Sequence, residues 1–197
     1  VLQPLGFEQG LVGMWTPAAA ADWAGCDPSC NNCGQVCPTG AIRALPLDEK
    51  RVARMGLAVV NERACLPHAD REACQLCVDE CDAAGYHAIE FMRVHPVLDE
   101  EGFPVEDSGY RAPVVRDDLC VGCGLCQARC YQVNDRDKGL LEESAIIIEA
   151  GEGRDDRMHT GSYLAKREAE RQAVIPPPPP ETEDNTPTDS YLPDFLP

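Results

Sequence analysis

Apolar and β-branched residues occur in short runs along this 197-residue chain, separated by polar, glycine-rich or proline-containing stretches. Runs of four or five such residues, bounded by turn-forming residues, are typical of short strands. The runs predict strands at 41–45, 57–60, 88–91, 112–116 and 145–149. No apolar run reaches the length of about 18 residues that a membrane-spanning helix needs.

Three further stretches have helical features. Pro17–Ala24 could form a short helix, with Thr16 as its N-cap and proline at the first helical position. In 48–56, acidic residues lead and basic residues follow, an order that suits the helix dipole, and Gly56 ends the pattern. Residues 162–172 predict one exposed helix. We interpret Trp15 and Trp23 as packing residues.

The 12 cysteines fall into three groups, and the third group is the most regular. Its members are Cys120, Cys123, Cys126 and Cys130, with the spacing C-x2-C-x2-C-x3-C. A loop with this spacing can wrap three thiolates around one corner of an iron–sulfur cubane, while the fourth usually ligates a neighbouring cluster. Gly122 and Gly124 suit backbone that follows a cluster closely.

The other two groups repeat this spacing with departures. The first consists of Cys26, Cys30, Cys33 and Cys37, is followed by Pro38, and has a first gap one residue longer. The second consists of Cys65, Cys74, Cys77 and Cys81, with the insertion 66–73 in its first gap and Asp82 after it. Each group is followed by a predicted strand, and the second and third are also preceded by one, which indicates an internal repeat of about 45 residues.

This repeat predicts an α+β fold of ferredoxin-like repeats, in which short strand hairpins and short helices surround [4Fe-4S] clusters. Aromatic residues make up only 6% of the chain, so metal ligation would supply part of the folding free energy. An even number of cysteines also fits a disulfide framework, and cysteine pairs also bind zinc. The repeated spacing favours three [4Fe-4S] clusters over both alternatives.

The formal net charge of −17 argues against a nucleic-acid partner, because phosphate binding needs a basic surface. An acidic electron carrier would be steered towards redox partners with basic docking patches. The chain contains no phosphate-binding loop, dinucleotide motif or covalent haem motif, so we predict an electron-transfer subunit and not a catalyst. Among the histidines, only His68 lies inside a cysteine motif.

The predicted organisation has five parts. They are an N-terminal docking segment at 1–25, a two-cluster ferredoxin-like unit at 26–91, an acidic insertion at 92–111, a third cluster-binding motif at 112–150 and an acidic Pro-rich tail at 151–197. The insertion predicts a hairpin or an ordered loop. From 173 the tail has a composition typical of disordered or extended chain. Its apolar end, 191–197, could contact a partner subunit.

The segment CNNCGQVCPTGAIRALPLDEK at 30–50 resembles polyferredoxins of the NapG/MauM type, and the likeness covers about residues 1–150. The resemblance implies electron transfer from a membrane quinol-oxidising partner to a periplasmic redox enzyme, within a larger respiratory or membrane-associated assembly. It also implies a periplasmic or membrane-associated location, with the cytoplasmic side left open. A free ferredoxin shuttle and a zinc-stabilised interaction module are the alternatives.

The resemblance also implies ligand sets. One cluster would use Cys26, Cys30, Cys33 and Cys81, and a second would use Cys65, Cys74, Cys77 and Cys37. In the third motif, Cys120, Cys123 and Cys126 would hold a cluster that Cys130 closes, or Cys130 would serve a fourth cluster with ligands upstream of Val1. Members of the family carry such an additional upstream motif.

Overall fold

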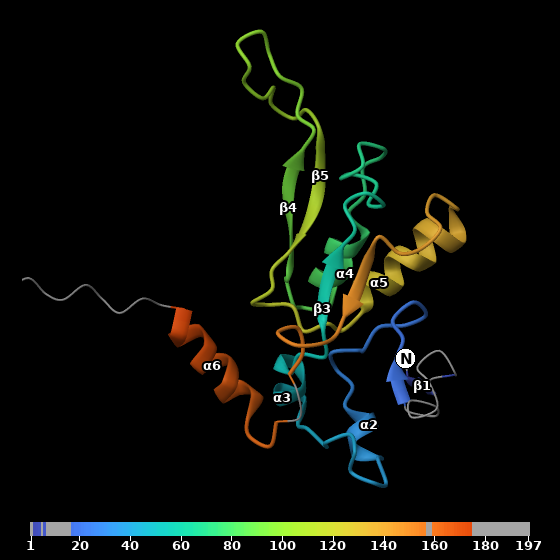
Figure 1. The fold of residues 1–197 in the computed structure, drawn as a ribbon, viewed down its shortest axis with the longest axis vertical. Helices are drawn as coiled ribbons and strands as arrows, with labels where there is room; N and C mark the ends of the chain where they lie inside the picture. Colours follow the sequence, from blue (N-terminus) through green and yellow to red (C-terminus); the bar gives the residue numbers. More distant parts are fainter. Residues whose placement is uncertain (1, 5, 7–16, 157–158, 175–197) are drawn as a thin grey trace, which may run out of the picture.

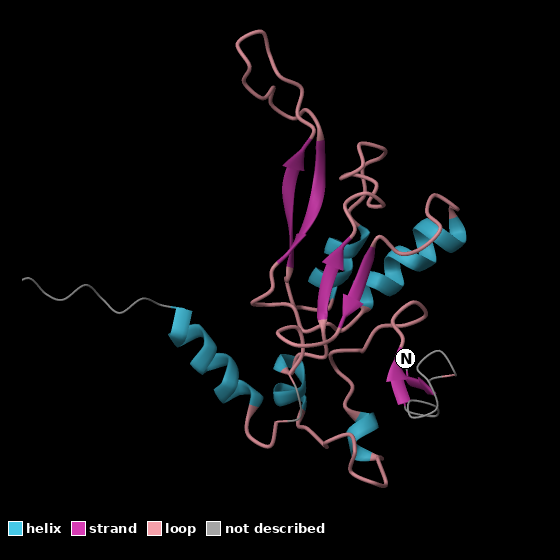
Figure 2. Ribbon diagram, in the orientation of Figure 1, coloured by secondary structure: helices cyan, strands magenta, loops and turns pink. Residues whose placement is uncertain are grey.

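The computed structural model describes residues 2–4, 6, 17–156 and 159–174. Short helices and two-stranded antiparallel sheets make up this part of the chain, which confirms the predicted α+β class (Figures 1 and 2). The strands are β1 (Leu2–Pro4), β2 (Pro17–Ala19), β3 (Leu57–Val60), β4 (Ile89–Val94), β5 (Tyr110–Val115) and β6 (Ile146–Glu149). The helices are α2 (Asn32–Gln35), α3 (Leu47–Val52), α4 (Leu76–Ala83), α5 (Leu125–Cys130), the π-helix η2 (Tyr131–Asp137) and α6 (Tyr163–Val174).

The second and third cysteine motifs share one core. Strand β3, which precedes the second motif, pairs with β6, which follows the third, so that Leu57 lies opposite Glu149. Strands β4 and β5 pair between the two motifs, with Ile89 opposite Val115. Helices α4 and α5 pack against each other, and the buried core lies between these elements. The last two cysteines of each of these motifs thus lie in a helix, and each motif is held by two strands, one in each sheet.

This pairing bears on the predicted organisation. The predicted strands at 57–60, 88–91, 112–116 and 145–149 are confirmed as β3 to β6, with small shifts at their ends. The strands with which they pair, however, do not follow the predicted organisation. The predicted two-cluster unit, 26–91, would have joined the first motif to the second, whereas the sheets join the second motif to the third.

The predicted helix at 17–24 is wrong. Residues 17–19 form β2, which pairs antiparallel with β1. A turn follows, and residues 24–27 have no regular structure. Backbone pairing with a distant segment has therefore overridden a weak local preference for helix. The predicted N-cap Thr16 and Trp15 lie outside the described residues.

The predicted strand at 41–45 is also wrong. This segment folds back on its own motif, where the Ile42 N–H donates to Cys37 Sγ at 3.4 Å and Asn31 Nδ2 donates to the Leu45 carbonyl at 2.7 Å. Its backbone is thus held by the cysteine loop and not by a neighbouring strand. Helix α3 confirms a helix near 48–56 but ends at Val52, because the following residues turn into β3.

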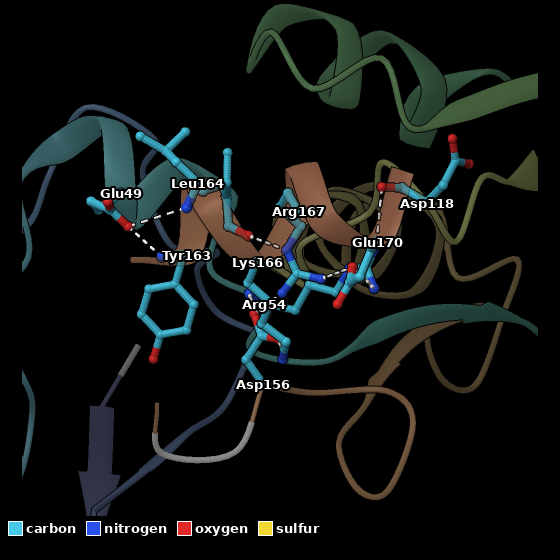
Figure 3. A network of polar contacts seen from close by, with 10 residues as sticks. Glu49, Arg54, Asp118, Asp156, Tyr163, Leu164, Lys166, Arg167 and Glu170 are labelled. Carbon is cyan, nitrogen blue, oxygen red and sulfur yellow. Dashed lines mark hydrogen bonds and ion pairs between the residues drawn. The ribbon is translucent and has the colours of Figure 1, made fainter. Parts of the chain in front are cut away.

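The predicted helix at 162–172 is confirmed as α6, although one of its faces is not exposed. Figure 3 shows Glu49 of α3 accepting the backbone N–H groups of Tyr163 and Leu164, which caps the first turn of α6. Farther along, Arg167 and Lys166 pair with the carboxylate of Asp156, whose side chain is 3% exposed. Helix α6 is therefore fastened to α3 and to the loop before it.

The segment 92–111 is the outer part of a hairpin, as predicted. It continues β4 and β5 beyond the core, and Figure 1 shows its loop reaching away from the rest of the molecule. Its apolar residues Val97, Leu98 and Phe103 are each more than half exposed. The disordered or extended tail was predicted from 173, but residues 173 and 174 still belong to α6; the rest of the tail, 175–197, lies outside the described residues.

Candidate metal centre

Four thiols from two motifs line one small pocket in the core. Cys65, Cys74 and Cys77 come from the second motif, and Cys130 comes from the end of the third. The walls are otherwise mostly apolar and include Val60, Leu66, Pro67 and Ile146. Three of these thiols are buried, and Cys74 is half-buried. We call these four residues the outer thiol set.

The thiols of this set influence one another. Burial raises the pKa of Cys65 to about 11, and the nearby thiols of Cys74 and Cys130 contribute in the same direction. Burial likewise raises the pKa of Cys77, with contributions from Cys65, Cys74 and Cys130. Protonated thiols are poor metal ligands, so a bound metal would have to displace these protons.

Asn134 completes the outer set. This residue lies in η2, is 2% exposed and points its Nδ2 at Cys74 Sγ and Cys130 Sγ, each at 3.7 Å. Its Oδ1 is buried and has no hydrogen-bond partner among the described residues. A buried amide that donates to two sulfurs suits thiolates that carry negative charge, which is how metal-bound cysteines are stabilised.

A second group, the inner thiol set, again combines the two motifs. We group Cys81, Cys120, Cys123 and Cys126 in it because their thiols act on one another: the thiol of Cys120, for example, adds to the rise that burial causes in the pKa of Cys81. Burial raises the pKa of Cys123 to about 11, and the thiols of Cys81 and Cys120 add to the rise. Burial also raises the pKa of Cys126, and Cys123 is the first of its neighbours to contribute. Cys77 of the outer set also contributes there, so the two sets are neighbours.

Backbone amides donate to sulfurs of the inner set. The Ala58 N–H lies 3.5 Å from Cys120 Sγ, and the Ala88 N–H lies 3.3 Å from Cys81 Sγ. Residue 58 belongs to β3, and residue 88 directly precedes β4. The strands that join the two motifs therefore also supply hydrogen bonds to the thiols, which tune iron–sulfur centres.

Two glycines shape the loop of the third motif, as the sequence predicted. Gly122 has a φ of +66° and Gly124 a φ of +79°, a region that residues with a side chain rarely adopt. A Cβ on Gly122 would lie 2.6 Å from the backbone nitrogen of Gly56. The Met55 N–H donates to the Val121 carbonyl at 2.9 Å, which holds the loop against this segment.

The first motif lies beside the inner set and is more open. The Cys26 N–H donates to the Cys123 carbonyl at 2.6 Å. Cys26, Cys33 and Cys37 line a wide pocket of about 1010 Å³, while Cys30 and Cys33 are exposed. Hydrogen bonds from the Ile42 N–H and the Thr39 hydroxyl lower the pKa of Cys37 to about 7.

These positions differ from the ligand sets that the resemblance implied. The pocket of Cys65, Cys74 and Cys77 contains Cys130 in place of Cys37. Cys81 lies with Cys120, Cys123 and Cys126 of the third motif, and Cys26 of the first motif also neighbours Cys123. The physical reason is the pairing of β3 with β6 and of β4 with β5, which brings the end of each motif to the start of the other.

Several important residues could not be singled out from the sequence. Asn134 lies outside every cysteine motif and carries no sequence signal. Tyr86 is a second example: burial raises its pKa to about 12, and the thiol of Cys123 adds to the rise. His68, by contrast, bonds the Pro113 carbonyl through Nε2 at 2.9 Å and is a hydrogen-bonded residue. Trp23 makes an edge-on contact with the ring of Tyr131 but is 61% exposed, so it packs against the core only in part.

All twelve cysteines lie in the described residues, and all are free thiols there. Across the described ranges, no three His, Cys, Asp or Glu side chains are grouped tightly enough to hold a single metal ion. Within the same part of the chain, every helix is too short or too polar to span a bilayer.

Taken together, the fold and the thiols define a cysteine-rich α+β protein with two mixed sets of four buried or half-buried thiols. The chain is 34% identical over 117 residues to the methylamine utilization ferredoxin-type protein MauM of Methylobacillus flagellatus. It is 33% identical over 117 residues to MauM of Methylophilus methylotrophus, and 28% identical over 117 residues to the ferredoxin-type protein NapG of Haemophilus influenzae.

Each of these alignments covers 59% of this chain, but only 41%, 42% and 36% of the respective relative. The chain thus spans about two fifths of the length of the curated relatives that it matches. No protein-family model matches the chain, and no solved structure is significantly similar to it. The predicted resemblance to ferredoxin-type proteins of the NapG/MauM type is confirmed.

Proposed function

We propose that this protein transfers electrons through iron–sulfur clusters that its cysteine motifs hold. The observation that carries the proposal is the presence of Cys130 in the pocket of Cys65, Cys74 and Cys77. Three thiols from one motif and the last thiol of another are the ligand pattern of two-cluster ferredoxins. The ferredoxin-type relatives support the same class of function.

In this proposal each mixed thiol set holds one [4Fe-4S] cluster. The outer set is Cys65, Cys74, Cys77 and Cys130, and the inner set is Cys81, Cys120, Cys123 and Cys126. These sets replace the ones that the resemblance implied. Cys26, Cys30 and Cys33 would contribute to a third cluster, closed by Cys37 or by a thiol from outside the 197 residues.

The residues of this chain do three things for a bound cluster. Apolar walls around the outer set exclude water, and the Asn134 amide donates to two of its sulfurs. The backbone amides of Ala58 and Ala88 donate hydrogen bonds to sulfurs of the inner set. The cluster supplies a one-electron couple, and its potential depends on these hydrogen bonds and on solvent exposure. Such hydrogen bonds favour the reduced, more negative state.

The three groups of thiols form a series. The first motif contacts the inner set through the hydrogen bond between Cys26 and the Cys123 carbonyl. The inner set in turn neighbours the outer set through Cys126 and Cys77. Electrons can therefore pass along the order first motif, inner set, outer set, in either direction.

We further propose that the chain works within a larger redox assembly. The names of the MauM relatives refer to methylamine utilization, which supports a role beside other redox proteins. By the same resemblance, a quinol-oxidising membrane protein is the proposed partner, and a periplasmic or membrane-associated location follows. Fractionation of the native cells with an antibody against this chain would test the location.

The decisive test of the chemistry is metal analysis of the full chain, purified without oxygen. Iron and acid-labile sulfide in equal amounts, with a broad brown absorption band that bleaches on reduction, are expected. At least about eight iron atoms per chain would correspond to the two mixed sets. Zinc without sulfide would overturn the proposal and favour an interaction module.

A further inference from the structure

A groove of about 480 Å³ opens beside the outer thiol set. It lies between the β4–β5 hairpin, the segment 72–76 and the π-helix η2. Cys74 and Asn134 both line it. Cys74 is half-buried, whereas Cys65, Cys77 and Cys130 are buried, so the groove marks the side on which the outer set comes nearest to solvent.

The groove carries unpaired positive charge in a strongly acidic chain. Arg111 stacks over the ring of Phe91, 4.0 Å from its centre, and Lys138 is exposed. Neither cation forms an ion pair with the described residues. Arg93 also lines the groove but pairs with Asp107 at 3.3 Å, and Glu72 is the remaining carboxylate. The lining is therefore net positive, although the whole chain has a charge of −17.

The groove also has the mixed character of a docking site. Leu66, Leu76 and Tyr110 add apolar surface to its lining. Docking surfaces combine such an apolar centre with charges that orient the partner. The outer set is, moreover, the end of the proposed series, because the first motif contacts the inner set. An electron that leaves or enters at this end would cross the groove.

We propose that this groove is the docking site of a redox partner protein that presents carboxylates to Arg111 and Lys138. The proposal rests on the proposed function, because it treats Cys74 as a cluster ligand. Charge complementarity selects the occupant, since two unpaired cations attract carboxylates. The net charge of the chain led us to expect partners with basic docking patches. At this groove the proposed partner surface is acidic instead.

Carbodiimide cross-linking tests the docking directly, because it joins carboxylates to lysine amines that lie in contact with them. The lysines of the chain are Lys50, Lys138 and Lys166. Lys50 donates to the Asp27 carbonyl and Lys166 pairs with Asp156, so these two serve as internal controls. The probe is an N-acetylated, glutamate-rich peptide, and the adducts are mapped by mass spectrometry on the cluster-loaded chain.

We expect most of the adduct on Lys138, and at least a threefold loss of it in Arg111→Glu, in accord with steering by local charge (about 10-fold or more in steered pairs). Arg63→Glu is the matched control, because Arg63 is exposed and lies outside the groove lining. Equal labelling of the three lysines, or an unchanged Lys138 adduct in Arg111→Glu, would overturn the proposal.

Electron exchange gives a second readout. One electron passes from the reduced protein to hexacyanoferrate(III), which becomes hexacyanoferrate(II), or to the cationic hexaammineruthenium(III). The double variant Arg111→Glu/Lys138→Glu should oxidise severalfold more slowly with the anion and faster with the cation, and added salt should remove both effects. Unchanged rates in this variant would overturn the proposal.

The two readouts separate the possible failures. Iron and sulfide are measured first, so a chain without clusters tells against the proposed function and not against the groove alone. The rate of oxidation by hexacyanoferrate(III) could fall in Arg111→Glu/Lys138→Glu while the peptide gives no adduct on Lys138. In that case the groove attracts only small anions, and the proposal of protein docking is overturned.

Discussion

At the scale of single residues, backbone geometry decides how closely the third motif follows its thiols. Gly122 combines a positive φ with backbone contact to Gly56, so neither space nor conformation is available to a side chain. We expect Gly122→Ala to lower the free energy of unfolding by about 2–4 kcal/mol, as strain and a steric clash add up. Chemical denaturation of the cluster-loaded chain would measure the loss.

Gly139→Ala is the matched control for this prediction. Gly139 has a φ of +61°, but nothing lies within 4 Å of a Cβ placed there. It should lose only the conformational part, about 1–2 kcal/mol. Equal losses in the two variants would show that the contact with Gly56 has no energetic weight.

Asn134 is the residue whose amide most directly reaches the outer set. Asn134→Leu keeps the size of the side chain but removes the donor to Cys74 and Cys130. Because the hydrogen bonds favour the more negative, reduced state, their loss should lower one reduction potential by about 20–60 mV, equivalent to about 0.5–1.5 kcal/mol. A redox titration followed by electron paramagnetic resonance would resolve the shift. A rise, or equal shifts at every centre, would contradict the assigned role.

At the scale of elements, α6 depends on a buried carboxylate. Burial opposes ionisation of Asp156, but hydrogen bonds from Arg167, Lys166 and the Arg54 N–H outweigh it and hold the pKa below its usual range. Asp156→Asn removes the carboxylate that Lys166 and Arg167 share, although Arg167 keeps its pair with Glu170, and should cost about 1–3 kcal/mol of α6 docking. Hydrogen exchange of the α6 amides would report it.

The control is Glu168→Gln, which removes an exposed pair with Arg171 on the same helix. It should change the protection of α6 by less than about 0.5 kcal/mol. If Asp156→Asn changed protection no more than this control does, the buried pair would not be what fastens α6.

The same carboxylate predicts how α6 responds to acid. Because the folded pKa of Asp156 is lowered, its contribution is fully present above the ordinary aspartate pKa of about 3.9 and is lost as the pH falls through the folded pKa. Hydrogen exchange should therefore show α6 loosening below about pH 4 in the native chain. In Asp156→Asn, this part of the pH dependence should vanish; if it persists unchanged, another group carries it.

The elements that the sequence predicted well are those whose residue pattern agrees with their packing in the core. The β-branched runs at 57–60 and 145–149 form strands because their side chains pack into the core between the motifs. The segments 17–24 and 41–45 were misassigned because their backbone partners are not visible in the residue pattern: β1 pairs with the former, and the cysteine loop of the first motif holds the latter.

At the scale of the whole molecule, the cysteine residues were evident from the sequence, but their grouping was not. With three similar motifs, the fourth cysteine of one motif could ligate the cluster of either of the other two. The spacing of the cysteines alone does not show which pairing occurs. In the structure, the pairing of β3 with β6 and of β4 with β5 places the thiols of the second motif beside those of the third, which supports the proposed sets. The sequence did contain one indication of this grouping, because only the second and third motifs have a predicted strand on both sides.

The distribution of charge over the surface is a second property of the whole molecule that the composition does not reveal. A net charge of −17 predicts basic partners on average, yet the groove beside Cys74 keeps two cations without ion pairs among the described residues. Distribution and not total charge decides where a partner docks.

Iron and sulfide counts on alanine variants test the mixed thiol sets most directly. Cys74→Ala and Cys130→Ala should each remove about four iron atoms per chain, and the double variant should remove no more, because both thiols serve one cluster. Cys74→Ala/Cys81→Ala should remove about eight, because these two thiols serve different clusters. The opposite result, in which Cys74→Ala/Cys130→Ala loses twice as much as either single variant, would contradict the account.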